Sequence, residues 1–320
     1  MTRPRLSVGL PVYNGERYVG QAIEALLGQT YQDFELIISD NASTDRTEEM
    51  CREYAAEDRR IRYVRQTRNL GAAPNHNLLI DLSRGELFKW ASADDLYARD
   101  LLKLCVDALD ADPGLVLTHS YTAIIDDDNR VVNPMRYGLA TASESASERF
   151  RSLLFGSGGD DDGGVIRLSV LRRTPLLGSY LHSDRTIVAD LALHGRFHHV
   201  PDWLYFRRDH PGRIERSSAT VRSFCVTLDP RRADRRRHPA VRLVGEYPLA
   251  YLRMIDRAPL SSPERWACRR WLAAWAASRC IPIDRRPPAS YADLMPTRSA
   301  AAGTVSPSVE TVVAGQERAG

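Results

Sequence analysis

The sequence is almost free of lysine. Among its 320 residues are 44 lysines and arginines together, and only Lys89 and Lys103 are lysines, which leaves 42 arginines. The formal net charge is +3, so there is no large positive excess of the kind that nucleic-acid-binding chains carry. Arginine does suit bidentate contacts with phosphate, and a phosphate-bearing ligand therefore stays open.

Cysteine is scarce and scattered. The five cysteines are odd in number and form no C-x-x-C pair, which argues against zinc-ribbon and thioredoxin-like proteins. Free cysteines fit a reducing compartment, and we expect a cytoplasmic location.

Long apolar runs are also missing. No stretch reaches 18 apolar residues, so we expect no transmembrane helix. The first residues enter a strand pattern directly and lack the apolar segment of a signal peptide. Peripheral contact with the inner face of a membrane is left open.

Strand and helix patterns alternate four times in the first 114 residues. Apolar runs predict buried strands, and apolar spacing of three to four residues predicts helices. The strands are expected at 5–13, 34–40, 61–66 and 86–92, and the helices at 14–31, 43–58, 71–83 and 96–112. This alternation predicts an α/β fold with a Rossmann-type, mostly parallel sheet flanked by helices.

Polar segments follow each of these strands, at residues 13–16, 40–45, 68–71 and 92–95. Ligands of parallel sheets bind beyond the carboxyl ends of the strands. We therefore expect the four segments to meet at one edge and to form a ligand site.

The pattern changes after residue 114. Residues 115–133 predict a strand, a turn and a strand, and residues 183–210 predict a helix and then a strand that ends in a basic loop. Residues 163–174 fit a strand or a helix equally well. We expect one domain over 1–215 with halves 1–114 and 115–215, then an Arg-rich linker and helical extension over 216–283. Residues 284–320 are rich in Pro, Ala, Ser and Gly, and we expect a disordered tail.

Several stretches together resemble the family 2 glycosyltransferases. They are "SVGLPVYNGERY", "FELIISDNASTD", "RNLGAAPNHN", "GELFKWASADD" and "SDRTIVADLALHGRFHHVPDWLYFRRDHPG", and the resemblance covers about residues 5–213. It implies a GT-A fold, a nucleotide-diphosphate sugar donor, a hydroxyl-bearing acceptor and inversion at the anomeric carbon. It also implies a divalent metal, Mn²⁺ or Mg²⁺.

The family's D-x-D motif aligns with Ser92-Ala93-Asp94, and Asp95 follows. The resemblance makes Asp94 and Asp95 metal ligands, with His210 as a third. Carboxylate oxygens suit Mg²⁺ and Mn²⁺, which keep water and phosphate in their shell. Ser92 can bind a ribose hydroxyl but is a poor metal ligand. Alternatively, the aspartates cap the next helix, and His210 is neither a ligand nor a base.

The resemblance places further residues at the donor. They are Pro11, Tyr13, Glu16, Asp40, Arg68, Asn69, Gly71, Asn77, Ser92, Ala93 and Arg208. Asp40 would read the nucleobase, although an Asx-turn explains it equally. Gly71 would let the backbone approach the ligand closely.

Asp184 aligns with the family's catalytic base, preceded by Ser183 where the family has Glu. A role as N-cap of the following helix is not exclusive of base catalysis. Two other D-x-D spacings, at 126–128 and 160–162, are predicted to be a hairpin turn and a solvated loop.

Residues 231–242 are arginine-rich but lack interleaved aromatic side chains, so we expect no nucleic-acid partner. A solvated surface, an anionic membrane or a lipid-linked acceptor each suits them. Two other functions are weighed. One is a non-catalytic nucleotide-sugar-binding protein of the same fold. The other is a nucleotidyltransferase, whose Gly- and Lys/Arg-rich phosphate loop after the first strand is absent.

Overall fold

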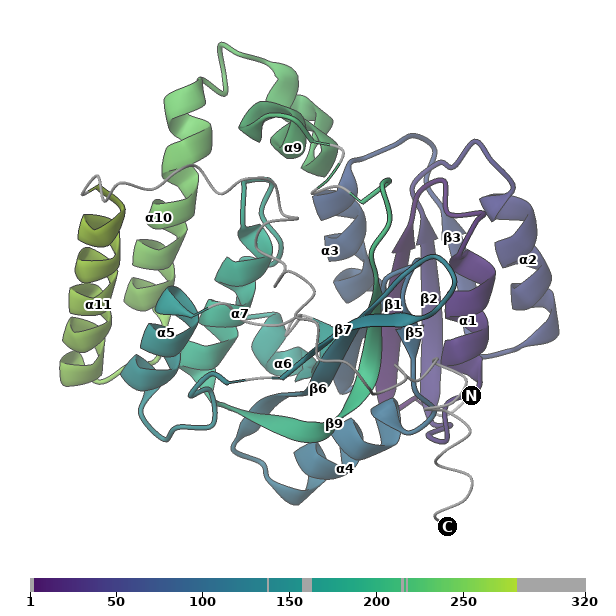
Figure 1. Cartoon of the computed structure of the whole chain (residues 1–320), viewed down its shortest axis with the longest axis horizontal. Helices are drawn as coiled ribbons and strands as arrows, with labels where there is room; N and C mark the ends of the chain where they lie inside the picture. Colours follow the sequence, from purple (N-terminus) through teal and green to yellow (C-terminus); the bar gives the residue numbers. More distant parts are fainter. Residues whose placement is uncertain (1–2, 137, 157–162, 214–215, 217, 281–320) are drawn as a thin grey trace, which may run out of the picture.

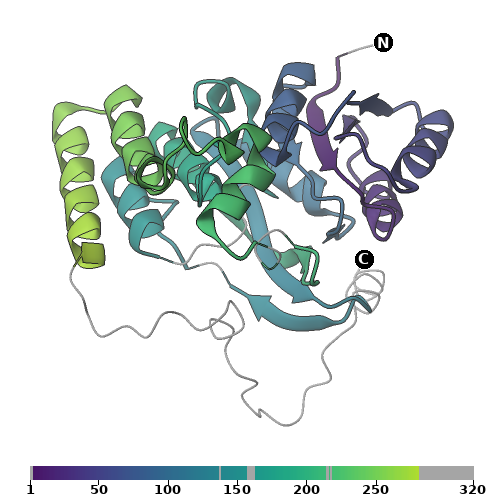
Figure 2. The ribbon, with the colours of Figure 1, turned by 90° about the horizontal axis from the view of Figure 1, so that it is seen from above.

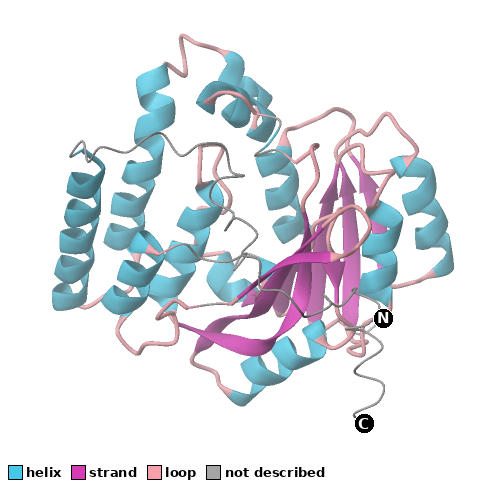
Figure 3. Ribbon diagram, viewed as in Figure 1, coloured by secondary structure: helices cyan, strands magenta, loops and turns pink. Residues whose placement is uncertain are grey.

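A curled sheet runs through the centre of the molecule, with helices against both of its faces (Figures 1 and 3). The structure is a computed structural model that describes residues 3–136, 138–156, 163–213, 216 and 218–280. Within these residues the sheet has nine strands in the order β3-β2-β1-β4-β8-β6-β9-β5, and β7 pairs with β6.

The first half alternates strand and helix, as predicted. Its four strands pair in parallel, and their side chains form much of the core. The strands are β1 (Leu6–Val12), β2 (Phe34–Asp40), β3 (Ile61–Arg65) and β4 (Leu87–Trp90). The connecting helices are α1 (Val19–Leu27), α2 (Thr47–Glu57) and α3 (Ala72–Leu82).

The helix predicted at 96–112 is wrong at its start. Leu96–Tyr97 forms a short strand, β5, and α4 begins only at Leu101 (Leu101–Ala111). Leu96 and Tyr97 are buried and pair antiparallel with Phe206 and Tyr205. Because no helix starts next to Asp94 and Asp95, the helix-cap explanation for these two aspartates is also wrong.

The second half of the sheet is mixed. Strand β8 runs antiparallel to both β4 and β6, whereas β9 runs parallel to β6. The strands are β6 (Leu115–Ile125), β7 (Val131–Met135), β8 (Val165–Arg167) and β9 (Arg196–Arg208), and the helices are α5 (Ala146–Phe155), α6 (Leu168–Leu171) and α7 (Ser183–His194). Residues 165–171 therefore form a strand followed directly by a helix.

The C-terminal extension consists of helices, as predicted. They are α9 (Val221–Leu228), the 3₁₀ helix η2 (Pro230–Ala233), α10 (Ala240–Arg257) and α11 (Ser262–Cys280). Tyr251, Met254 and Trp275 pack with residues of α5 and α7 in a separate apolar cluster. Figure 2 shows α10 and α11 at the opposite side of the molecule from α1 and α2.

Two predicted segments, 160–162 and 284–320, lie outside the described residues. Within the described part of the chain, every helix is too short or too polar to cross a bilayer.

Candidate active site

Backbone and side-chain hydrogen bonds join the loops that follow β1, β2 and β3. The Asn14 N–H donates to Ser43 Oγ (2.9 Å), and Glu16 Oε2 accepts from the Arg46 N–H (3.0 Å). Asn41 Nδ2 donates to Asn69 Oδ1 (2.9 Å) and so ties the second loop to the third. The structure thus brings the predicted segments together at the carboxyl edge of the sheet.

Asp94 faces a histidine and an arginine from the loop after β9. Its Oδ2 accepts a hydrogen bond from His210 Nε2 (2.9 Å) and lies 3.7 Å from Arg213 Nη1. The Asp94 side chain is 27% exposed, which leaves part of the carboxylate accessible to a ligand. Arg213 was not among the residues predicted for the site.

Asp95 points the other way and is fully buried. One oxygen accepts from the Tyr205 hydroxyl, and the other accepts from the Arg208 N–H (2.9 Å) and Arg213 Nη1 (3.3 Å). With both oxygens engaged and no exposure, Asp95 anchors β9 and Arg213. The metal role predicted for Asp95 does not suit this geometry, because protein donors already occupy both of its oxygens.

The neighbouring charges shift the two carboxyl pKa values in opposite directions. Burial alone would raise the pKa of Asp94, but the His210 hydrogen bond and the charge of Arg213 hold it below its usual range. Burial, followed by the charge of Asp94, raises the pKa of Asp95 to about 6. Asp94 therefore stays ionised to a lower pH than Asp95.

Arg208 is fully buried and connects three segments. Its guanidinium donates to the backbone oxygens of Asp94 (2.9 Å) and Asp126 (2.9 Å) and to Gln21 Oε1 (3.1 Å), and it lies over the Tyr18 ring. The donor contact predicted for Arg208 does not suit this burial, because the guanidinium already donates to other protein groups.

The tip of the β6–β7 hairpin also contacts the two residues that precede α1, Arg17 and Tyr18. The Tyr18 hydroxyl donates to Asp127 Oδ1 (2.6 Å), and Arg17 Nη2 pairs with Asp127 Oδ2 (3.0 Å). The segment 126–128 is a turn, since the Asn129 N–H donates to the Asp126 oxygen (3.1 Å). The hairpin turn predicted there is what the structure contains.

Lys89 lies inside β4 and is fully buried. Its ammonium group donates to the Gly163 oxygen and lies 5.1 Å from the Tyr97 ring centre and 5.5 Å from that of Tyr205. It therefore supports the tyrosine that bonds Asp95. Sequence reasoning missed it, although a lysine within an apolar strand of a chain with two lysines is a signal.

Asp40 is buried at the end of β2 with both oxygens engaged. Oδ1 accepts from the Ser43 N–H (2.9 Å), and Oδ2 accepts from the Tyr63 hydroxyl (2.6 Å). The bond from Ser43 closes the loop three residues on, one residue beyond the Asx-turn that was the alternative. With both oxygens engaged, the buried Asp40 does not suit the predicted nucleobase contact. Pro11, within β1, is half-buried, whereas Tyr13 and Glu16 are exposed in the loop that follows.

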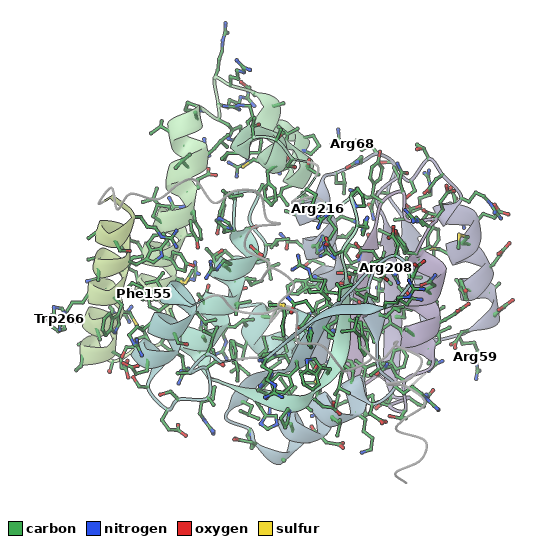
Figure 4. All side chains as sticks on the ribbon, viewed as in Figure 1. Arg59, Arg68, Phe155, Arg208, Arg216 and Trp266 are labelled. Atoms are coloured by element: carbon green, nitrogen blue, oxygen red, sulfur yellow. The ribbon has the colours of Figure 1, made fainter. Side chains whose placement is uncertain are left out.

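Gly71 has φ +91°, which only glycine adopts easily. A Cβ at this position would lie 2.5 Å from the Leu228 oxygen and 2.8 Å from Asp229 Cα. The close approach predicted for Gly71 is therefore toward the extension and not toward a ligand. Arg68 and Asn69 in the same loop are exposed, and Figure 4 shows Arg68 at the outer rim.

Asn77 bonds the segment that leads into α7. Its Nδ2 donates to the Leu177 oxygen (2.9 Å), and its Oδ1 accepts from the Leu177 N–H (3.0 Å). The donor contact predicted for Asn77 thus gives way to a positioning role. Asp184 follows in the first turn of α7 and is exposed, while the N-cap position belongs to His182. The N-cap alternative for Asp184 is wrong by two residues.

The residues around Asp94 fit a divalent cation with two protein ligands. Asp94 Oδ2 and His210 Nε2 come from different segments and meet at 2.9 Å. Within the described residues no cluster of three or more His, Cys, Asp or Glu side chains could hold a metal ion. A two-ligand site suits Mn²⁺ or Mg²⁺, since these ions complete their shell with water and phosphate oxygens.

The model of the family described as glycosyl transferase family 2 matches residues 7–171, which is just over half of the 320 residues. The chain therefore belongs to glycosyl transferase family 2.

Two relatives show how far the sequence likeness extends. Glycosyltransferase GlyG of Streptococcus pneumoniae is 31% identical over 125 residues, which are 39% of this chain and 42% of that protein. Chondroitin synthase of Escherichia coli is 30% identical over 130 residues, 41% of this chain and 19% of the synthase. The chain thus matches less than half of the length of these relatives.

Solved structures share the fold. S. aureus TarS 1–349 in complex with UDP-GlcNAc has a TM-score of 0.54 and 16% identity, covering 86% of this chain and 91% of that chain. Mannosyltransferase PcManGT from Pyrobaculum calidifontis, solved with GDP-Man and Mn²⁺, has a TM-score of 0.50 and 18% identity, covering 89% of both chains. These likenesses show a GT-A type of fold.

Proposed function

We propose that the protein transfers a sugar from a nucleotide-diphosphate sugar to a hydroxyl group of an acceptor, with inversion at the anomeric carbon. The observation that supports this best is that Asp94, His210 and Arg213 meet at the edge of the sheet where strands β1, β2 and β3 end. That edge is where parallel α/β sheets bind their ligands.

The reaction needs positive charge beside the departing diphosphate. Arg213 is held in place by Asp95 and by the Arg208 oxygen (2.7 Å), and so presents a fixed guanidinium. A divalent cation bound by Asp94 and His210 would supply further Lewis-acid neutralisation of the leaving group. The depressed pKa of Asp94 keeps that ligand ionised.

The nucleoside and sugar are assigned to the loops around the same edge. Tyr13, Glu16, Arg68 and Asn69 are exposed there, and Ser92 and Ala93 are half-buried beside Asp94. The Ser92 hydroxyl is assigned to a ribose hydroxyl. The solved relatives in complex with UDP-GlcNAc and GDP-Man agree with a nucleotide-sugar donor.

Asp184 is the proposed base. Its carboxylate is exposed in the first turn of α7, and Asn77 fixes the segment before that helix. Asp184 takes the proton of the acceptor hydroxyl while that oxygen bonds to the anomeric carbon. The bond from the anomeric carbon to the diphosphate oxygen breaks on the opposite face, which inverts the configuration. The acceptor is a glycan, a secondary metabolite or a lipid-linked molecule, and a lipid-linked acceptor calls for peripheral membrane association.

Calorimetric titration of the full chain with UDP, GDP and dTDP, each with Mn²⁺ and again with EDTA, tests the donor site. We expect one diphosphate to bind and to weaken at least tenfold in EDTA, in Asp94→Ala and in His210→Ala. Asp128→Ala and His198→Ala remove exposed residues of the same types and should bind as the wild type. Failure of all three diphosphates to bind contradicts the donor site.

The chemistry is tested by Asp184→Asn. With a donor and acceptor that the wild type uses, transfer should fall by a factor of about 100 or more, since a general base contributes about 10²–10⁴. Diphosphate binding should persist. A wild type that binds the diphosphate tightly but releases none of it from any nucleotide sugar would be the non-catalytic alternative, and released pyrophosphate would indicate a nucleotidyltransferase.

A further inference from the structure

Helix α10 has apolar side chains on two sides. Leu243, Tyr251, Met254 and Ile255 face the protein and are buried. Four others are exposed, at 79%, 62%, 45% and 42%: Val241, Val244, Leu249 and Leu252. Spacings of eight and eleven positions place Val241, Leu249 and Leu252 along one side of the helix, and Val244 lies at the edge of that side, next to the buried residues. We call these four residues the outer stripe.

Arginines flank the outer stripe. Residues 231–242 contain six arginines and one aspartate. Arg232 is turned inward and pairs with Glu246 (2.6 Å). Arg231 pairs with Asp229 (2.8 Å) and Arg237 with Asp234 (3.6 Å), but the two arginine side chains are 80% and 84% exposed. Arg235 and Arg236 are also exposed, as is Arg253 further along α10. The stripe therefore has a strongly positive border at its amino-terminal end.

We propose that the outer stripe and the exposed arginines at 231–237 bind an anionic lipid surface. An apolar helix side with a cationic border is the combination that inserts at the headgroup level of a bilayer. A negative leaflet attracts each exposed arginine. A second copy of the chain is a poorer occupant, because a symmetric contact through this face would bring two copies of the same arginine cluster together.

The placement of α10 agrees with a membrane acceptor. Figure 1 shows its amino-terminal end at the top of the molecule, the same end at which β1, β2 and β3 finish. A surface bound there would lie on the side of the candidate active site. Lipid binding by α10 rests on the proposed function only through the membrane-bound acceptor, and it can be measured without donor or acceptor.

Co-sedimentation of the full chain with vesicles tests the proposal. We expect binding to phosphatidylcholine vesicles that contain phosphatidylglycerol, weak binding to phosphatidylcholine alone, and loss of binding as salt is added. Reversal of Arg235, Arg236 and Arg237 to Glu should weaken binding at least 100-fold, since each arginine contributes roughly fivefold. Leu249→Asp with Leu252→Asp should weaken it at least tenfold.

Val132→Asp is the matched control, because Val132 is 57% exposed on β7, away from α10 in both Figures 1 and 2. It should bind as the wild type. Circular dichroism and diphosphate titration of each variant show that the fold and the donor site are intact, so failure here is separable from failure of the proposed function. The proposal is overturned by equal binding to neutral vesicles, by absent binding, or by a dimer in solution that Leu249→Asp dissociates.

Discussion

The two adjacent aspartates should differ sharply in their effect on stability. Asp95→Ala removes the acceptor of three buried hydrogen bonds, which come from the Tyr205 hydroxyl, the Arg208 N–H and Arg213 Nη1. Each buried unsatisfied donor costs about 1–3 kcal/mol. The burial that raises the pKa of Asp95 to about 6 offsets part of this cost, since the charged carboxylate is itself unfavourable there. We expect a loss of about 2–4 kcal/mol in the free energy of unfolding.

Asp94→Ala removes a partly exposed group with one hydrogen bond, from His210. It should change the free energy of unfolding by no more than about 1 kcal/mol. Urea unfolding followed by fluorescence, in EDTA so that bound metal does not contribute, measures both variants. Diphosphate titration should give the reverse order, with Asp94→Ala the more damaged.

Equal stability losses in the two variants would refute the division of roles. So would an Asp95→Ala protein within 1 kcal/mol of the wild type, because the three donors would then have found other acceptors or water. Either result would return Asp95 to the set of candidate ligands.

Three further outcomes are expected. Gly71→Ala should lower the free energy of unfolding by about 2–4 kcal/mol, because its Cβ would meet the Leu228 oxygen at 2.5 Å and its φ is +91°. Gly245 has open space around it, so Gly245→Ala should leave the free energy of urea unfolding unchanged or raise it by up to about 1 kcal/mol. Burial, followed by the charge of His198, lowers the pKa of His199 to about 4. An unfolded His titrates near pH 6.5, so between about pH 6.5 and 4 the unfolded chain binds a proton at His199 that the folded chain does not. Stability is therefore lost as the pH falls through this range, and the wild type should lose about 1–2 kcal/mol more than His199→Phe between pH 7.5 and 5. Asn77→Ala should lower the transfer rate more than diphosphate affinity, because it releases the segment before Asp184; an equal loss of both would place Asn77 at the donor.

Strands β1, β2 and β4 were predictable because each is buried on both sides and reads as a mostly apolar run. Strand β3, at the edge of the sheet, is only partly buried. Strand β2 begins and ends where the sequence predicts it, at Phe34–Asp40. Strand β5 was not predictable. Its two residues are held in place by pairing with Tyr205 and Phe206, more than 100 positions away, and no local pattern carries that information.

The site was predictable in residue type and place but not in the role of each residue. Asp94 and Asp95 are chemically identical, and only the arrival of β9 decides which one is buried. Gly71 was recognised as a position that needs glycine, but the neighbour that requires it, Leu228, lies 157 residues further along the chain. Arg208 and Asn77 align with donor-binding residues of the family, but in this structure their side chains bond other groups of the protein.

The contact between the β6–β7 hairpin tip and the residues before α1 affects how substrates can enter the site. The two halves are already joined through the sheet at β4 and β8. The bonds of Tyr18 and Arg17 to Asp127, together with Arg208, join them a second time on the other side. Because the two halves are joined at two places, we expect no hinge motion that opens and closes them relative to each other. We expect donor entry and product release to depend on movement of the loops above the strand ends.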